Sequence, residues 1–222
     1  MEQKILPPLS LNKKLYYLLI SIALNTFGNA LTVSMNMGSS MWTAGSVNVA
    51  RYLSVDLGWI LIGNATLGIL WNIWLDKKID WKFIAGNIAF VLPFSTLVQL
   101  WVGLFATLGL PQLPWLVRLV LDVFGIFLIA IAVSIYQRVN WIIHPLDEVT
   151  NTLRFRYCGG NPVKAQLLNF SVPIAVMCVV FALSGRLDAV NIGTIAVLLF
   201  QGAWIGWADR YIFPTLPHYF RH

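Results

Sequence analysis

Residues 15–35 read LYYLLISIALNTFGNALTVSM and carry no charged side chain. A helix of about 20 residues, rising about 1.5 Å per residue, crosses the roughly 30 Å hydrocarbon core of a lipid bilayer. Five further apolar stretches follow, at residues 57–75, 83–108, 115–136, 163–184 and 191–207. The sequence therefore predicts an all-α membrane protein with six transmembrane helices, built as a single polytopic domain over residues 1–222.

The composition of the chain indicates the same class. The mean hydropathy is +0.73, and 58% of the residues are hydrophobic while 11% are charged. A soluble protein of this composition would expose large apolar patches, which a bilayer accepts. The net charge of +6 comes from basic residues scattered between the apolar stretches, not from a basic stripe. The predicted partner is therefore the lipid bilayer, with no nucleic acid.

Basic residues divide unequally between the connections of the six predicted spans. One side receives twelve of the 15 Lys and Arg residues, and the other side receives Arg51, Arg118 and Arg186. Lys and Arg are enriched in cytoplasmic loops. This asymmetry predicts a multi-pass protein of the cell membrane with both termini in the cytoplasm. The long first apolar run also favours an uncleaved first helix over a signal sequence.

A weak internal repeat relates the two halves of the chain. Gly86 opens the third predicted span as Gly193 opens the sixth, 107 positions later. Each half would hold three spans, and an odd number makes the second copy enter the membrane from the opposite side. The sequence therefore predicts two inverted repeats, over about residues 15–108 and 115–208. Many secondary transporters have this arrangement.

A polar segment follows the first span of each predicted repeat, at residues 37–54 and 140–160. Each segment is expected to begin with a short or broken helix. In an inverted pair, the two segments approach the bilayer midplane from opposite faces and line an enclosed or watery cavity. The alternative is that both are surface loops that carry short interfacial helices.

In these segments the chain resembles the YczE/YyaS/YitT family of bacterial integral membrane proteins. In that family, each half carries a glycine after its first span, a proline or tryptophan, an acid, and later a Gly-Thr pair. The matching residues are Gly38, Trp42, Pro145, Asp147, Gly193 and Thr194, with Thr43 where the acid of the first half would stand. The resemblance implies a bacterial membrane protein of this architecture and a permease function.

The second polar segment contains His144, Pro145, Asp147 and Glu148 in the pattern of a helix start. Proline suits the first turn of a helix, and acids complement the positive end of the helix dipole. Helix capping alone explains the pattern. The functional alternative places the histidine and the two acids beside a cavity, where they bind a proton or a cation.

Arg118 and Asp122 lie four residues apart near the start of the fourth predicted span. This spacing puts the two side chains on one helix face, and a carboxylate inside the membrane needs a partner. The sequence predicts a structural ion pair between them. The alternative is a substrate or proton role for Asp122.

Enzyme and metal motifs are missing from the sequence. There is no Walker loop, dinucleotide fingerprint, HExxH or GxSxG motif, and the three histidines are scattered. Cys158 and Cys178 are interpreted as ordinary reduced thiols. A general base at His144 or Asp147 would lack a paired nucleophile. We therefore expect no enzyme activity, no cofactor and no metal.

The leading hypothesis is a small secondary-type permease for an unidentified small solute or ion. The predicted binding site consists of Ser39, Trp42, Thr43, Asn87, His144, Asp147, Glu148 and Thr194. The alternative is a non-transporting accessory protein that binds a lipid or a partner membrane protein and modulates it. Gly202 and Gly206 are spaced for close helix packing or for a homodimer contact.

The charge asymmetry gives a topological prediction. A reporter fused after Leu110 should read as extracytoplasmic, and one fused after Arg156 should read as cytoplasmic. Paired phosphatase and fluorescent-protein fusions at both positions measure this. The reverse reading at either position contradicts the six-span topology.

Overall fold

A computed structural model describes residues 9–38, 40–55, 57–188 and 190–219, and these residues form helices and connecting loops without a strand. The helices are α1 (Leu11–Met35), α2 (Met41–Leu53), α3 (Leu57–Asp76), α4 (Trp81–Thr107), a 3₁₀ turn η1 (Leu110–Gln112), α5 (Trp115–Val139), α6 (Pro145–Arg156), α7 (Pro162–Ser184) and α8 (Ile192–Tyr211). The predicted all-helical class is confirmed. The described part of the chain also has a short helix in each polar segment, α2 and α6.

Five of these helices are long and apolar enough to cross a membrane. They are Leu11–Met35, Ile84–Thr107, Trp115–Val139, Pro162–Ser184 and Ile192–Tyr211. The helix α3, expected as the second span, is 20 residues long and is not among the five. Several long apolar helices are consistent with a multi-pass membrane protein, while the number of six spans stays a prediction.

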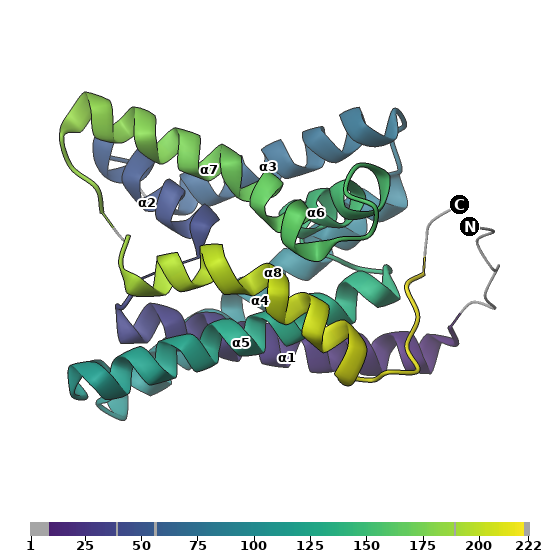
Figure 1. Cartoon of the computed structure of the whole chain (residues 1–222), viewed down its shortest axis with the longest axis horizontal. Helices are drawn as coiled ribbons and strands as arrows, with labels where there is room; N and C mark the ends of the chain where they lie inside the picture. The colour runs from purple at the N-terminus through teal and green to yellow at the C-terminus, as the bar shows by residue number, and fades with distance from the viewer. Residues whose placement is uncertain (1–8, 39, 56, 189, 220–222) are drawn as a thin grey trace.

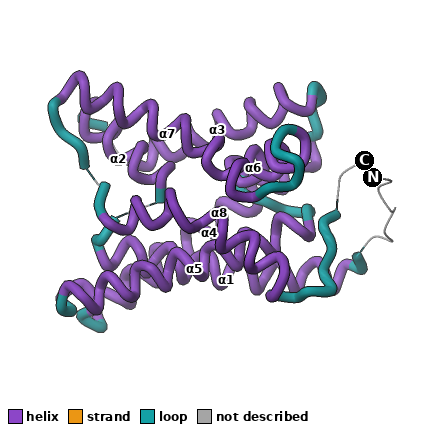
Figure 2. Tube along the Cα trace, viewed as in Figure 1, coloured by secondary structure: helices purple, strands orange, loops and turns teal. Residues whose placement is uncertain are grey.

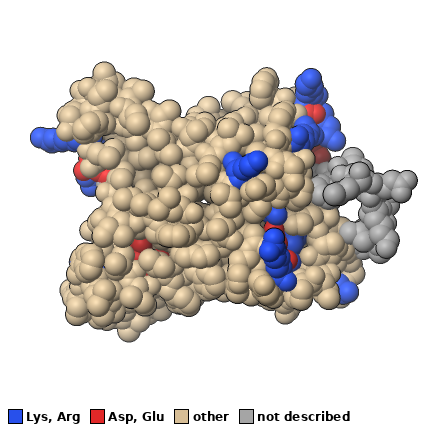
Figure 3. All heavy atoms as spheres, viewed as in Figure 1, with Lys and Arg blue, Asp and Glu red and all other residues tan. Residues whose placement is uncertain are grey.

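The helices lie in two layers (Figures 1 and 2). One layer contains α1, α4, α5 and α8, and the other contains α2, α3, α6 and α7. Contacts between α7 and α8 join the layers along the middle of the molecule. The face in Figure 3 is mostly uncharged, with charged side chains at its left edge and over its right-hand part.

The pair α1 and α5 makes the most extensive helix contact in the described chain. The two helices cross at Gly28 and Gly125. A Cβ atom added to Gly28 would lie 2.7 Å from the Gly125 carbonyl oxygen, and one added to Gly125 would lie 2.8 Å from the Gly28 carbonyl oxygen. Backbone therefore packs directly on backbone, as at many helix contacts in membranes.

The start of α1 and the end of the described chain lie at one end of the molecule. The Tyr16 and Tyr17 rings contact the Phe213 ring with centroids 6.3 and 5.2 Å away, and Lys14 lies 5.8 Å over the Trp141 ring. At the other end of α1, the Gly193 N–H at the start of α8 donates to the Met37 carbonyl at 2.8 Å. Helices α1 and α8 therefore run antiparallel.

Glycines Gly202 and Gly206 of α8 pack within the chain. A Cβ atom at Gly202 would lie 2.7 Å from the Val163 Cα atom, and one at Gly206 would lie 3.0 Å from the Pro162 ring. These two glycines thus allow close approach of α7 to α8. The homodimer stays a prediction.

The glycine crossing predicts that bulk at its centre destabilises the fold. Gly28→Val should lower the free energy of unfolding by about 1–3 kcal/mol, because the added atoms overpack a backbone contact. Gly103→Val is the control, since a Cβ atom there meets nothing within 4 Å. Detergent unfolding of both variants measures the difference. Equal stability of the two variants contradicts the tight crossing.

Candidate functional site

The starts of the short helices α2 and α6 are connected through Asn169 of α7. The Trp42 indole Nε1 donates to Asn169 Oδ1 at 2.7 Å. The Asn169 Nδ2 donates to the Leu146 carbonyl at 2.9 Å and also to the Thr150 hydroxyl. Asn169 is buried, so this chain of hydrogen bonds joins the two short helices inside the protein.

Helix α3 contacts both short helices in the same layer. The Asn64 Nδ2 of α3 donates to the Ser46 hydroxyl of α2 at 2.7 Å. Further along α3, the Asn72 Nδ2 donates to the Pro145 carbonyl of α6 at 2.8 Å. Each short helix is therefore held by amide side chains of its neighbours, as expected where lipid offers no alternative partner.

Asp147 lies in the first turn of α6 and contacts α5. Its Oδ2 accepts a hydrogen bond from the Tyr136 hydroxyl at 2.5 Å, and its backbone carbonyl accepts from Gln137 Nε2 at 3.2 Å. The Asn25 Nδ2 of α1 donates to the Tyr136 hydroxyl oxygen at 3.5 Å. This group of polar side chains lies between α6 in one layer and α1 and α5 in the other.

Burial changes the proton affinities of His144 and Asp147, which lie outside the five helices that are long and apolar enough to cross a membrane. Burial raises the pKa of the Asp147 carboxyl, while His144 and the Tyr136 hydroxyl oppose that shift. Burial also lowers the pKa of His144. Its ring faces Phe90 and Phe94, with centroids 6.3 and 6.2 Å away. The arrangement favours a neutral histidine beside an acid that binds a proton more readily than an exposed aspartate.

The remaining predicted site residues divide between the two short helices. The Thr43 hydroxyl lies 2.9 Å from the Ser40 hydroxyl at the start of α2, and Thr194 adjoins Gly38 just before that helix. Glu148 is buried on α6, and Asn87 is buried on α4, next to Gly86, which faces Ile142. Ser39 lies outside the described residues. The predicted single site is thus two groups, with Asn169 as the link between them.

The predicted ion pair between Arg118 and Asp122 is wrong. The Arg118 Nη1 donates to the Met35 carbonyl at 3.2 Å, and Asp122 is absent from the ion pairs of the described residues. Asp122 is fully buried, and neither of its carboxyl oxygens has a hydrogen-bond partner. The spacing put both residues on α5 but did not show that Arg118 extends toward the end of α1.

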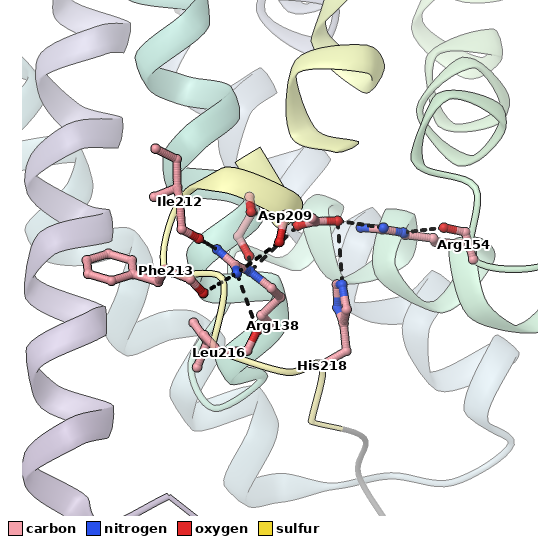
Figure 4. A network of polar contacts seen from close by, with 9 residues as sticks. Arg138, Arg154, Asp209, Ile212, Phe213, Leu216 and His218 are labelled. Atoms are coloured by element: carbon pink, nitrogen blue, oxygen red, sulfur yellow. Dashed lines mark hydrogen bonds and ion pairs between the residues drawn. The ribbon is translucent and has the colours of Figure 1, made fainter. Parts of the chain in front are cut away.

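A charged network around Asp209 was not predicted (Figure 4). Asp209 of α8 accepts from Arg154 of α6 at 2.6 Å and from the Ser134 hydroxyl of α5 at 2.7 Å. Arg138 lies 3.6 Å from Asp209 and His218 lies 3.5 Å away. The sequence signal was an acid near the end of the last apolar stretch, but its partners are distant in the chain.

The guanidinium of Arg138 also binds carbonyl groups just after the end of α8. It is 1% exposed, and it donates to the carbonyls of Ile212, Phe213 and Leu216 at 2.8, 3.1 and 3.3 Å. These carbonyls follow the end of α8, and Arg138 Nη1 also donates to the Asp209 carbonyl in the last turn of this helix at 3.4 Å, where a helix leaves carbonyls without intrahelical partners and a cation is favourable. Arg138 and Asp209 therefore hold α5, α6, α8 and the following segment together.

The described residues form an all-helical protein, and its five long apolar helices are consistent with a multi-pass membrane protein. Residues 12–210 match a protein family described as a family of unknown function (DUF6198), and the chain belongs to that family. No curated protein and no solved structure matches the chain. The description assigns no activity and does not name the YczE/YyaS/YitT family, so that resemblance stays a prediction.

The Asp209 network predicts a large loss of stability when its acid is removed. Asp209→Asn should lower the free energy of unfolding by about 3–5 kcal/mol, because it leaves buried arginines without their counter-charge. Asp188→Asn is the control. It breaks the exposed Asp188–Arg51 pair, which should cost about 0–1 kcal/mol. Thermal unfolding of both variants in detergent measures this, and equal melting temperatures contradict the account.

Proposed function

We propose that the protein is a small secondary-type permease that moves a small solute or ion between its two helix layers. The observation that carries this proposal is the chain of hydrogen bonds from Trp42 through Asn169 to Thr150. It brings the starts of two short helices to one region inside a protein made largely of apolar helices. A helix start offers unpaired N–H groups, and transporters use such half-helix ends to bind solutes and ions.

An internal duplication supports the proposal. Asn64 of α3 bonds to Ser46 of α2, and Asn169 of α7 bonds to Thr150 of α6. The two asparagines are 105 positions apart, and their hydroxyl partners are 104 positions apart. Equivalent helices thus make equivalent contacts in the two halves.

The helix ends of the two halves correspond as well. Asn36 follows the end of α1 and Asn140 follows the end of α5, each with a φ of 50°, and a short helix begins five residues after each asparagine. Arg51 at the end of α2 pairs with Asp188 beyond α7, and Arg156 at the end of α6 pairs with Asp76 at the end of α3. These pairs support a duplication over about residues 15–108 and 115–208.

The duplication is proposed to be inverted. The end of α1 adjoins the start of α8, while the start of α1 adjoins Trp141, just after α5. Helices α1 and α5 therefore run in opposite directions, as three spans per repeat require. If α3 also crosses the membrane, the chain has six spans and both termini would be cytoplasmic, in agreement with the charge asymmetry. The YczE/YyaS/YitT-like pattern belongs to this same proposal.

The mechanism we propose is alternating access at the boundary between the layers. Ser40, Thr43 and Thr194 would bind from one side, and His144 and Asp147 from the other. Rocking of the layer of α2, α3, α6 and α7 against the layer of α1, α4, α5 and α8 would open the space between the two groups first to one face of the membrane and then to the other. The contact of Arg154 with Asp209 crosses the boundary, so opening at that end would require this pair to separate.

The accessory-protein hypothesis has one observation in its favour. An apolar groove of about 260 Å³ runs between α7 and α8, lined by Met41, Ile174, Phe181 and Leu198 among others. A lipid chain would fit its chemistry. A protein that only binds lipid there needs no exchange of access at the layer boundary, and this difference separates the two hypotheses.

Cysteine labelling tests the permease proposal without knowledge of the solute. Thr43→Cys and His144→Cys would each be placed in a chain with Cys158→Ser and Cys178→Ser. A membrane-impermeant thiol reagent should label both positions from both faces of oriented vesicles, because each position would open to either side in turn. The control Leu100→Cys, on an exposed apolar surface, should stay unlabelled. Labelling of each site from one face alone contradicts alternating access.

The same assay separates a functional role of Asp147 from capping. Asp147→Asn retains a side-chain acceptor for the Tyr136 hydroxyl, so its stability should change by less than about 1 kcal/mol. We expect the two-sided labelling to become one-sided in this variant. Unchanged two-sided labelling would leave Asp147 with a capping role.

A further inference from the structure

A small cavity encloses the carboxyl group of Asp122. Its volume is about 10 Å³, and its lining includes Thr32, Ser40, Gly193 and Gln201. Such a volume is about that of one water-sized sphere. Asp122 is 0% exposed, and both carboxyl oxygens lack hydrogen-bond partners. The cavity is therefore lined by a buried acid whose carboxyl oxygens have no hydrogen-bond partner.

The start of α8 shapes this cavity. Gly193 is the second residue of α8, and a Cβ atom there would overlap Asp122 Oδ2. The glycine thus leaves room for the carboxyl group. The Gly193 N–H donates to the Met37 carbonyl at 2.8 Å, which holds the end of the α8 dipole beside the acid. This positive end compensates part of a carboxylate charge.

Little else on the surrounding elements balances that charge. Arg118 on the same helix donates to the Met35 carbonyl and forms no ion pair with Asp122 among the described residues. Among the described residues, no ionisable side chain lines the cavity from α1, from residues 38 and 40, or from α8. A buried carboxylate without a partner is unfavourable. The remaining charge has to be neutralised by something that enters the cavity.

We propose that Asp122 reversibly binds a proton in this cavity, and that this proton is the coupling ion of the permease. The second half of the statement rests on the proposed function. The step transfers one proton from water to a carboxylate oxygen, forms one O–H bond and leaves a neutral acid. A hard metal cation needs about six oxygen ligands or its own waters, and the cavity has room for neither.

Infrared spectroscopy tests the proton site directly. Difference spectra of the purified protein in lipid, recorded between high and low pH, should contain carboxylic acid C=O bands from the acids that titrate, Asp147 among them, and one band should belong to Asp122. Asp122→Asn should remove this band, and Asp122→Glu should shift its frequency if the Asn variant does not fold. The matched control Asp188→Asn alters an acid in an exposed pair and should keep the band. Gly193→Ala should alter it, because the added carbon displaces the carboxyl group.

The outcomes separate the proton site from the transport proposal. If every band persists unchanged in both Asp122 variants, the site is overturned. If sodium ions remove the Asp122 band at constant pH, the site binds a metal cation in place of a proton. This result also overturns the inference. A band assigned to Asp122, together with one-sided cysteine labelling, leaves the proton site intact and contradicts the permease.

Discussion

The backbone contact of Gly28 with Gly125 lies at the centre of the first helix layer. It joins α1 to α5 along most of their length, and α4 and α8 pack against this pair to complete one layer. Each helix of the pair ends at an asparagine in the left-handed conformation, Asn36 or Asn140. At these residues the chain leaves the first layer and enters the second as a short helix. A side chain at the crossing would push both exits apart.

Side-chain hydrogen bonds from Tyr136 to Asp147 and from Arg154 to Asp209 cross the boundary between the two layers, while Asn169 connects two helices within the second layer. In lipid, apolar surface gives little reason for helices to associate, so such hydrogen bonds and close packing carry the specificity. The two layers are also joined where Gly202 and Gly206 pack against the start of α7, so the proposed change of access would exchange the polar contacts around this junction.

The sequence predicted the helices better than the contacts between them. Apolar runs and their lengths located the long helices, and the polar segments correctly indicated α2 and α6. The spacing of Arg118 and Asp122 defined a common helix face but not the Met35 carbonyl that Arg118 binds instead. Asp209 was missed because Arg138, Arg154 and His218 come from separate parts of the chain. Asn169 is one of several amide residues in the apolar stretches of the sequence. Only its position between α2 and α6 distinguishes it.

Distance measurements between spin labels test most directly whether the two layers move against each other. One pair would join Leu53 to Leu116 and the other Trp74 to Tyr211, because these exposed positions place one label in each layer at opposite ends of the molecule. Between high and low pH, one distance should lengthen as the other shortens. Two narrow distributions that do not change with pH would contradict the account.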